Sequence, residues 1–255
     1  MPDVQNAHVS ADGPMIEARG LSKFYGDFAA VRDVSFSINR GEVVAFLGPN
    51  GAGKSTVMKL LTGYLSPSEG CARVAGYDMS QDRIAGSVCL GYLPENGPLY
   101  PDMTPQSLLE FFAQARGMSA SHAMRRIDEV VALCSLKEVL RKPIGKLSKG
   151  YRQRVGMAHT LLHEPEVLIL DEPTAGLDPN QIADVRERLR HLGRDKTILL
   201  STHILQEVEA VASRILFIHQ GRIVFDGSLT EMRSKGSNLD VIFSELTAEA
   251  ESPSA

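Results

Sequence analysis

The fold is decided by one stretch of the sequence, Gly48-Pro49-Asn50-Gly51-Ala52-Gly53-Lys54-Ser55-Thr56, which stands directly behind the apolar run Val43–Leu47. It matches the pattern G-x-x-x-x-G-K-[ST], and the residues after it read as a helix. Glycines let the backbone curl until several N–H groups point at one anion, and the helix adds its positive end. In such a loop Lys54 reaches the β- and γ-phosphates of a nucleotide, while the Ser55 hydroxyl ligates Mg²⁺. We therefore predict a phosphate-binding loop for a magnesium nucleoside triphosphate.

Length, composition and net charge limit the fold classes, the cellular compartment and the partners that can be predicted. The 255 residues are enough for one large α/β domain with a small subdomain. Three cysteines without metal-like spacing read as thiols in a reducing compartment, which favours the cytoplasm. The polar start of the chain is unlike a secretory signal, and no apolar run approaches the roughly 20 residues that span a bilayer. A net charge of −4 and the lack of a basic run argue against nucleic acid as the main partner.

The first part of the chain reads as short strands around the phosphate loop. Residues 15–18 and 34–38 alternate apolar with polar, which is typical of half-exposed antiparallel strands. We expect two more short strands around 71–74 and 88–92, and a helix from the loop to about Gly63. Residues 1–14 are expected to form a flexible tail.

The sequence pattern of residues from about 95 to about 150 predicts an all-helical insertion. Thr104 is placed to cap a helix with Pro105 in its first turn, and that helix carries apolar residues on one side. A second helix is expected over 121–134, because its apolar residues recur at helical spacing. Such a segment would interrupt an α/β core between two of its strands.

The α/β pattern returns after the insertion. The continuous apolar runs 167–171 and 197–201 are typical of strands buried on both faces of a parallel sheet. Residues 215–219 and 222–225 read as a hairpin joined across Gln220 and Gly221. We predict one nucleotide-binding domain over 15–235, and a partly disordered extension over 236–255.

Two carboxylates close the buried strand that ends at residue 171. Side chains at the carboxyl end of a parallel strand lie at the sheet edge where ligands bind in open α/β folds. Asp171 is placed to hold Mg²⁺, and Glu172 to polarise an attacking water, since phosphoryl transfer needs an oriented nucleophile. An Asp-Glu pair alone would read as a solvated turn, so its weight comes from the motifs around it.

Five motifs follow one another within about residues 15–235. They are Gly48 to Thr56, Leu147 to Gln153, Leu168 to Pro173, Ala175 to Asp178, and Ser201 to His203. In this order and spacing they together resemble the ATP-binding subunit of an ABC transporter. The Leu-Pro-Glu at 93–95 and the Asp-Pro-Asn-Gln at 178–181 are most similar to ATPases of ABC-2-type exporters, including the gliding-motility-associated group. The resemblance implies a P-loop NTPase (RecA-like) α/β core with a small antiparallel β subdomain and a helical insertion.

The resemblance also implies the cofactors and the site residues. ATP with Mg²⁺ would be bound by the loop residues Gly48, Pro49, Asn50, Gly51, Ala52, Gly53, Lys54, Ser55 and Thr56, by Tyr25 stacked on adenine, and by Ser148, Gly150 and Asp178. Glu172, His203 and Lys54 would be catalytic, with His203 contacting the γ-phosphate. In the family the signature end, here Ser148 and Gly150, closes over the nucleotide of the other subunit, so hydrolysis requires a head-to-tail homodimer or a paired ATPase subunit.

Three positions depart from the family pattern. Lys149 and Tyr151 replace a Gly and the Gln of the usual signature Leu-Ser-Gly-Gly-Gln, and Lys149 either faces water or adds positive charge near the phosphates. Glu95 stands where the family commonly has Gln. A carboxylate there either binds Mg²⁺ more tightly than an amide or repels the triphosphate until the metal arrives. We expect Glu95 to be a metal-proximal residue, with Ser55 and Asp171, that links the helical insertion to the nucleotide.

The expected function is to power transport by a separate transmembrane permease, from the cytoplasmic face of the membrane. Two alternatives remain at this point. A soluble ABC-type ATPase acting on ribosomes or DNA would usually carry two cassettes or a long coiled-coil insertion, and this sequence has neither. A P-loop GTPase would carry a base-reading N-K-x-D motif after the phosphate loop, and none follows.

Overall fold

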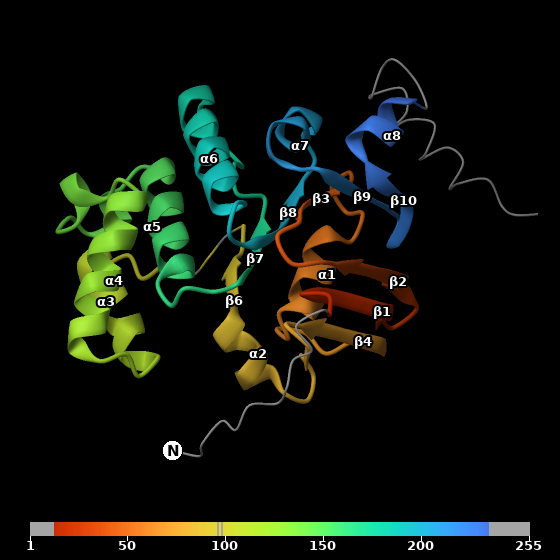
Figure 1. Cartoon of the computed structure of the whole chain (residues 1–255), viewed down its shortest axis with the longest axis horizontal. Helices are drawn as coiled ribbons and strands as arrows, with labels where there is room; N and C mark the ends of the chain where they lie inside the picture. The colour runs from red at the N-terminus through yellow and green to blue at the C-terminus, as the bar shows by residue number, and fades with distance from the viewer. Residues whose placement is uncertain (1–12, 96, 98, 235–255) are drawn as a thin grey trace, which may run out of the picture.

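The structure, a computed structural model, describes residues 13–95, 97 and 99–234. The expected tail, apart from Gly13 and Pro14, and the expected extension over 236–255 lie outside the described residues. Two β-sheets with helices around them make up the described part of the chain (Figure 1). This arrangement confirms the predicted α/β core with an antiparallel β subdomain.

The larger sheet has the strand order β10-β9-β3-β8-β7-β6 in the described chain. Its strands are β3 (Val43–Leu47), β6 (Leu90–Leu93), β7 (Val167–Asp171), β8 (Thr197–Thr202), β9 (Arg214–His219) and β10 (Arg222–Ser228). All neighbouring strands are parallel except the hairpin β9–β10, which turns across Gln220 and Gly221 as predicted. The carboxyl ends of β3, β7 and β8 therefore meet at one edge, where the phosphate loop begins.

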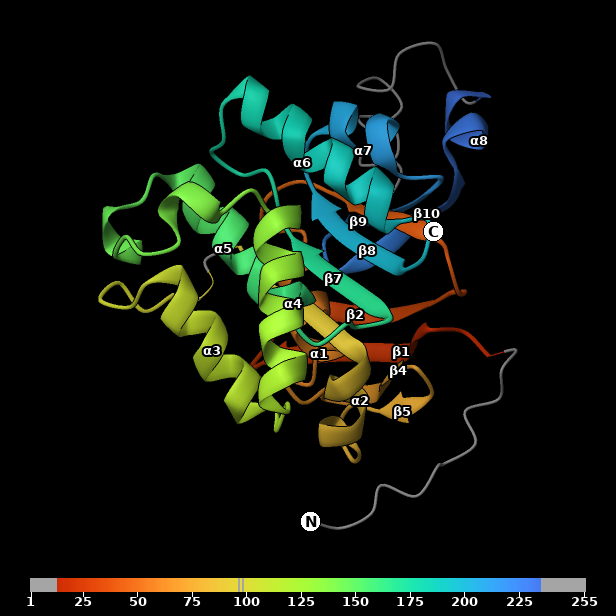
Figure 2. The same ribbon diagram turned by 60° about the vertical axis from the view of Figure 1, so that its left-hand side comes forward.

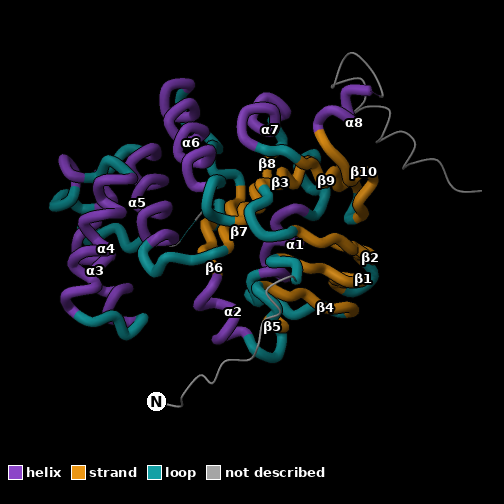
Figure 3. Tube along the Cα trace, viewed as in Figure 1, coloured by secondary structure: helices purple, strands orange, loops and turns teal. Residues whose placement is uncertain are grey.

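The smaller sheet is antiparallel and has the order β2-β1-β4-β5 among the described residues. It consists of β1 (Ile16–Tyr25), β2 (Phe28–Ile38), β4 (Glu69–Val74) and β5 (Tyr77–Asp78). Ile16 pairs with Ile38 and with Val74, so the predicted strands around residues 15–18, 34–38 and 71–74 are confirmed. Helix α1 (Lys54–Leu61) lies between the two sheets (Figure 3).

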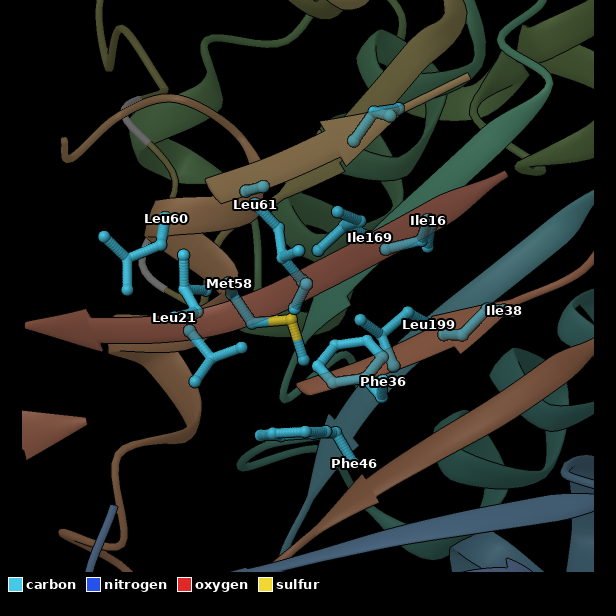
Figure 4. Packing of buried hydrophobic residues seen from close by; sticks show 14 of the residues in the cluster. Ile16, Leu21, Phe36, Ile38, Phe46, Met58, Leu60, Leu61, Ile169 and Leu199 are labelled. Carbon is cyan, nitrogen blue, oxygen red and sulfur yellow. The ribbon is translucent and has the colours of Figure 1, made fainter. Parts of the chain in front are cut away.

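The apolar faces of α1 and of both sheets meet in one core (Figure 4). Met58 and Leu61 of α1 are fully buried there beside Phe46 of β3 and Leu21 of β1. Successive side chains of a strand point to opposite faces, so the run of β7 divides between two cores. Ile169 packs on the α1 side, whereas its two neighbours in β7 pack against the helical insertion. A continuous apolar strand is required because both of its faces are covered.

The helical insertion stands beside β6 and β7 (Figure 2). Its elements are α3 (Pro105–Ala115), α4 (Ala120–Leu133), the 3₁₀ turns η1 (Lys137–Val139) and η2 (Ile144–Lys146), and α5 (Lys149–Leu161), which leads back to the sheet. Thr104 caps α3 as predicted, because its hydroxyl accepts the backbone N–H of Ser107 at 3.1 Å. Helix α4 starts one residue before the predicted 121, with Ser119 as its N-cap.

One predicted strand is partly wrong. Residues 88 and 89 belong to α2 (Arg83–Cys89), and β6 starts only at Leu90. Val88 is 63% exposed on this helix, so its apolar character does not reflect a place in the sheet. The remaining helices are α6 (Pro179–Leu192), α7 (Leu205–Val211) and α8 (Leu229–Ser234). Helices α7 and α8 cover the β3 and β9 end of the larger sheet.

Candidate nucleotide-binding site

The phosphate loop connects β3 to α1 and depends on glycine at two close approaches. A Cβ at Gly48 would lie 2.4 Å from the carbonyl oxygen of Ile218. Gly53 has a φ of 106°, and a Cβ there would lie 2.6 Å from the carbonyl oxygen of Ala30. A side chain fits at neither position, so the loop packs directly on the neighbouring backbone. The predicted strand, loop and helix are present.

Lys54 is the first residue of α1, and its side chain folds back over the loop. It is buried, and its ammonium donates to the carbonyl oxygen of Gly48 at 2.7 Å and to that of Pro49 at 3.2 Å. The same Nζ lies 3.4 Å from a carboxylate oxygen of Glu172. The ammonium is therefore held in the space above the loop, where a bound triphosphate would carry its negative charge.

Asp171 and Ser55 bring two oxygen groups together at the end of β7. The Asp171 carboxylate is buried, and its Oδ1 accepts the Ser201 hydroxyl at 2.5 Å and the Ser55 hydroxyl at 3.3 Å. Ser201 is the residue that pairs with Asp171 across β7 and β8. Hard oxygen donors of this kind, one carboxylate and one hydroxyl, suit Mg²⁺ that also keeps water and phosphate ligands. The residues present fit the predicted ion.

Glu172 and His203 form a contacting pair at the sheet edge. The φ of Glu172 is 49°, a left-handed value that turns its side chain away from the path of β7. Its backbone N–H donates to the Ser201 hydroxyl at 3.0 Å. His203 follows β8, and its Nδ1 lies 3.0 and 3.1 Å from the two carboxylate oxygens of Glu172. A carboxylate held between His203 and Lys54 is set to orient and polarise a water molecule.

A buried glutamate behind this pair was not found by sequence reasoning. Glu207 of α7 accepts the hydroxyl of Thr202 at 2.6 Å and also that of Thr174. It thereby ties the segment after β8 to the segment after β7. A glutamate in a short helix reads as solvated, so the sequence carries no signal for this contact.

The predicted residues gather around one cavity of about 460 Å³. Its lining contains nine of them, namely Asn50, Gly51, Gly53, Lys54, Ser55, Thr56, Glu95, Glu172 and His203. Gly48, Pro49 and Ala52 form the rest of the loop beneath it. Tyr25, Ser148, Gly150 and Asp178 do not line it. One wall is made by Phe28 and Ala30, which sequence reasoning did not single out, and by Ala175, which it named only as the start of a motif.

The aromatic wall of the cavity comes from the turn between β1 and β2. Tyr25 and Phe28 are paired across that turn, and both are exposed, at 51% and 65%. Phe28 lines the cavity, whereas the Tyr25 ring lies under the ammonium of Lys23, 5.6 Å from its centroid. The aromatic residue that the family pattern pointed to is thus accompanied by a second one closer to the loop.

Ser148 and Asp178 begin two neighbouring helices. The Ser148 hydroxyl accepts the backbone N–H of Tyr151 at 3.3 Å and thereby caps α5. Asp178 caps α6 and accepts two backbone N–H groups at 3.0 Å each. Gly150 is buried, and a side chain does not fit there because its Cβ would lie 2.6 Å from the Gln181 side chain. These residues have local structural roles, and their contacts with nucleotide stay predictions.

Glu95 lies between two cavities. It lines the nucleotide cavity and also a second cavity of about 380 Å³, whose wall includes Phe112, Lys149 and His159. The His159 ring lies 3.9 Å from that of Phe112, and burial lowers the pKa of His159 to about 4. The second cavity thus lies between the end of β6 and the helices α3 and α5, and Glu95 lines both spaces.

Within the residues that the structure describes, no helix has both the length and the apolar character needed to cross a membrane.

Comparison with known proteins identifies the family. The ABC transporter family model matches residues 31–175, more than half of the chain. The chain is 37% identical to the "Uncharacterized ABC transporter ATP-binding protein YxlF" of Bacillus subtilis, over 87% of this chain and 73% of that protein. It is 36% identical to the "Daunorubicin resistance ATP-binding protein DrrA3" of Streptomyces coeruleorubidus, over 90% of this chain and 74% of that protein.

Solved structures agree with this relationship. The "Structure of ATP binding subunit of ABC transporter" superposes with a TM-score of 0.83 at 34% identity, covering 91% of this chain and 99% of that one. The dimeric structure of the bacterial ABC transporter cassette MJ0796 has a TM-score of 0.77 at 24% identity, over 84% of this chain and 99% of that one, and shares its fold. The chain belongs to the ABC transporter family as an ATP-binding subunit, and it is an ATPase.

Proposed function

We propose that two copies of this chain, or this chain and a paired ATPase subunit, close on ATP and drive a separate membrane-spanning permease. The observation that carries the proposal is that the predicted site residues lie in two separate places on the chain. Lys54, Asp171, Glu172 and His203 meet at one sheet edge, whereas Ser148 at the start of α5 lies outside that cavity. A helix N-terminus carries partial positive charge and free N–H groups, so the start of α5 suits the triphosphate of a second copy.

The contacts of each group support a specific role in hydrolysis. The loop N–H groups and Lys54 would hold the β- and γ-phosphates, and Ser55 and Asp171 would hold the ion. Mg²⁺, when bound, supplies positive charge that neutralises the phosphate oxygens. Glu172 orients the attacking water and accepts its proton, while His203 fixes the Glu172 carboxylate. Tyr25 and Phe28 offer flat surfaces to the base.

The permease would dock at the second cavity from the cytoplasmic side. That cavity mixes the apolar side chains of Leu99 and Phe112 with the charged Glu95, Lys149 and Arg152. Glu95 reaches both this cavity and the nucleotide cavity, so it is placed to link docking to nucleotide binding. The printed name of the Streptomyces relative, a daunorubicin resistance protein, supports an ABC-2-type exporter as the assembly.

The test is a substitution in the part of the site that serves the other copy. Ser148→Arg places a large cation at the start of α5 without touching the cavity lining, so we expect ATP affinity of the monomer to stay unchanged while hydrolysis falls at least tenfold. Affinity is measured by titration calorimetry and hydrolysis by phosphate release. The conservative variant Ser148→Thr, which keeps the capping hydroxyl, is the control. Loss of affinity with a normal turnover rate per bound ATP would contradict the divided site.

A further inference from the structure

The start of α5 interlocks with the segment that leads from β7 to α6. Gly176 in that segment has a φ of 67°, and a Cβ there would lie 2.2 Å from the Lys149 Nζ and 3.3 Å from its Cδ. The Gln153 amide donates to the carbonyl oxygen of Pro173 at 2.9 Å. Gln181 fills the space beside Gly150, within 2.7 Å of its missing Cβ. Three residues of α5, namely Lys149, Gly150 and Gln153, therefore pack against the segment 173–181 of the same chain.

Among these three residues of α5, Lys149 is the one whose role the sequence did not explain. It replaces a glycine of the usual signature, and sequence reasoning left it facing either water or phosphate. In the structure the end of its side chain lies against the Gly176 backbone. The segment under it begins with Pro173 and Thr174, directly after Glu172, and Ala175 lines the nucleotide cavity. A shift of this segment would therefore move Ala175 in the cavity wall and the backbone that carries Glu172.

We propose that Lys149 is a positioning residue that clamps the segment 173–178 of its own chain and so sets the placement of Glu172. The inference rests on the proposed dimer, because only there does the clamp join two sites. Ser148 and its neighbours would serve the ATP of the partner, whereas Glu172 serves the ATP of its own chain. A structural change where the start of α5 contacts the partner's ATP is then transmitted through Lys149 to Glu172, which acts on the ATP bound by its own chain.

A mixed dimer separates this role from direct contact with phosphate. One protomer carries Lys149→Ala and the other carries Glu172→Gln, each with a different affinity tag so that the mixed pair is purified by two successive tags. The Glu172→Gln protomer cannot hydrolyse its own ATP, so turnover reports only the site whose Glu172 belongs to the Lys149→Ala chain. The signature end facing that site comes from the other protomer and is intact.

The clamp predicts that this mixed dimer hydrolyses ATP about tenfold more slowly than the pair with an unaltered first protomer, with an unchanged KM for ATP. Lys149→Arg in the first protomer, which keeps a long cationic chain over Gly176, should restore the rate. Lys146→Ala there is the matched control, because it removes an exposed lysine three residues before Lys149, leaves the Gly176 contact in place and should keep the full rate. A mixed dimer with Lys149→Ala that turns over at the full rate would overturn the proposal.

A double-mutant cycle on the unmixed protein tests the same contact. Gly176→Ala puts a methyl group where the Lys149 chain end lies and adds backbone strain at a positive φ. If the two residues act through one contact, Gly176→Ala slows kcat by a larger factor in the native chain than in the Lys149→Ala background, where only the backbone strain remains. Multiplying effects would contradict the clamp. Failure of the proposed dimer is seen separately, as monomers of every variant in the presence of ATP.

Discussion

Glu172 shows at the scale of a single residue why this site is more than a carboxylate at the end of a strand. A non-glycine residue at a φ of 49° is held there by its surroundings, here the Ser201 hydroxyl on its N–H and His203 on its carboxylate. The Asp-Glu pattern predicted the position of these groups. It could not predict the turn of the backbone, because the partners that impose it come from β8.

The Phe28 side chain is expected to contribute to nucleotide binding. Phe28→Ala removes an aromatic wall of the cavity, so the Kd for ATP should rise about three- to tenfold, equivalent to ~1 kcal/mol of stacking. The measurement is titration calorimetry with ATP, and Phe111→Ala on the exposed side of α3 is the control. If Tyr25→Ala weakens binding while Phe28→Ala does not, the family assignment of Tyr25 alone is correct.

Glu95 is expected to tune the response to Mg²⁺. Its carboxylate faces the cavity that also holds Ser55, so Glu95→Gln removes a hard anionic donor near the ion. We predict that the Mg²⁺ concentration for half-maximal ATPase activity rises severalfold in Glu95→Gln, with the maximal rate less affected. Glu110→Gln, on the exposed face of α3, is the control. Superimposable Mg²⁺ curves for the native chain and Glu95→Gln would argue against a metal-proximal role.

Helix α5 shows at the scale of an element how much a local pattern can and cannot predict. Its start was predictable, because Ser148 is a good N-cap and the signature motif fixes its place. The packing of α5 was not predictable, because Lys149 contacts Gly176 and Gly150 contacts Gln181, and no helix or strand periodicity of the sequence connects these residues. The same holds for residues 88 and 89, where an apolar pattern predicted a strand and the chain forms the end of α2.

The far end of α5 is expected to make stability depend on pH. Burial lowers the pKa of both His159 and His163 to about 4, and the His163 Nε2–H donates to the Leu90 carbonyl at 2.9 Å. Unfolded histidines titrate near 6.5, so the unfolded chain binds more protons below that pH. The stabilisation is complete above pH 6.5 and is lost as pH falls towards 4. We predict a decrease in unfolding free energy of up to ~2 kcal/mol per histidine between pH 7.5 and 5.

This dependence is measured by urea denaturation at the two pH values. His163→Gln removes one of the two titrating groups, so it should reduce the difference between pH 7.5 and 5. His191→Gln, at an exposed position in α6, should leave that difference unchanged. An equal pH dependence in the native chain and in His163→Gln would show that His163 is protonated in the folded state as readily as in the unfolded one.

The described part of the molecule is organised around a mostly parallel sheet whose two faces pack against different parts of the chain. One face is joined through α1 to the antiparallel sheet that carries Phe28, and the other face packs against the helical insertion that leads to Ser148. The order of motifs along the chain predicted these parts and their connection. The relative placement of the nucleotide cavity and the start of α5 depends on the packing of α5 and α6, which only the structure shows.

The central claim is that ATP joins two copies of the chain through the start of α5. The most direct measurement is the mass in solution of the Glu172→Gln variant with ATP and Mg²⁺, by size-exclusion chromatography with light scattering. Glu172→Gln should bind ATP without hydrolysing it, and we predict a particle of twice the 27.8 kDa of one chain, which returns to one chain when Ser148→Arg is added. A particle of one chain at saturating ATP, or a dimer that persists with Ser148→Arg, would contradict the account.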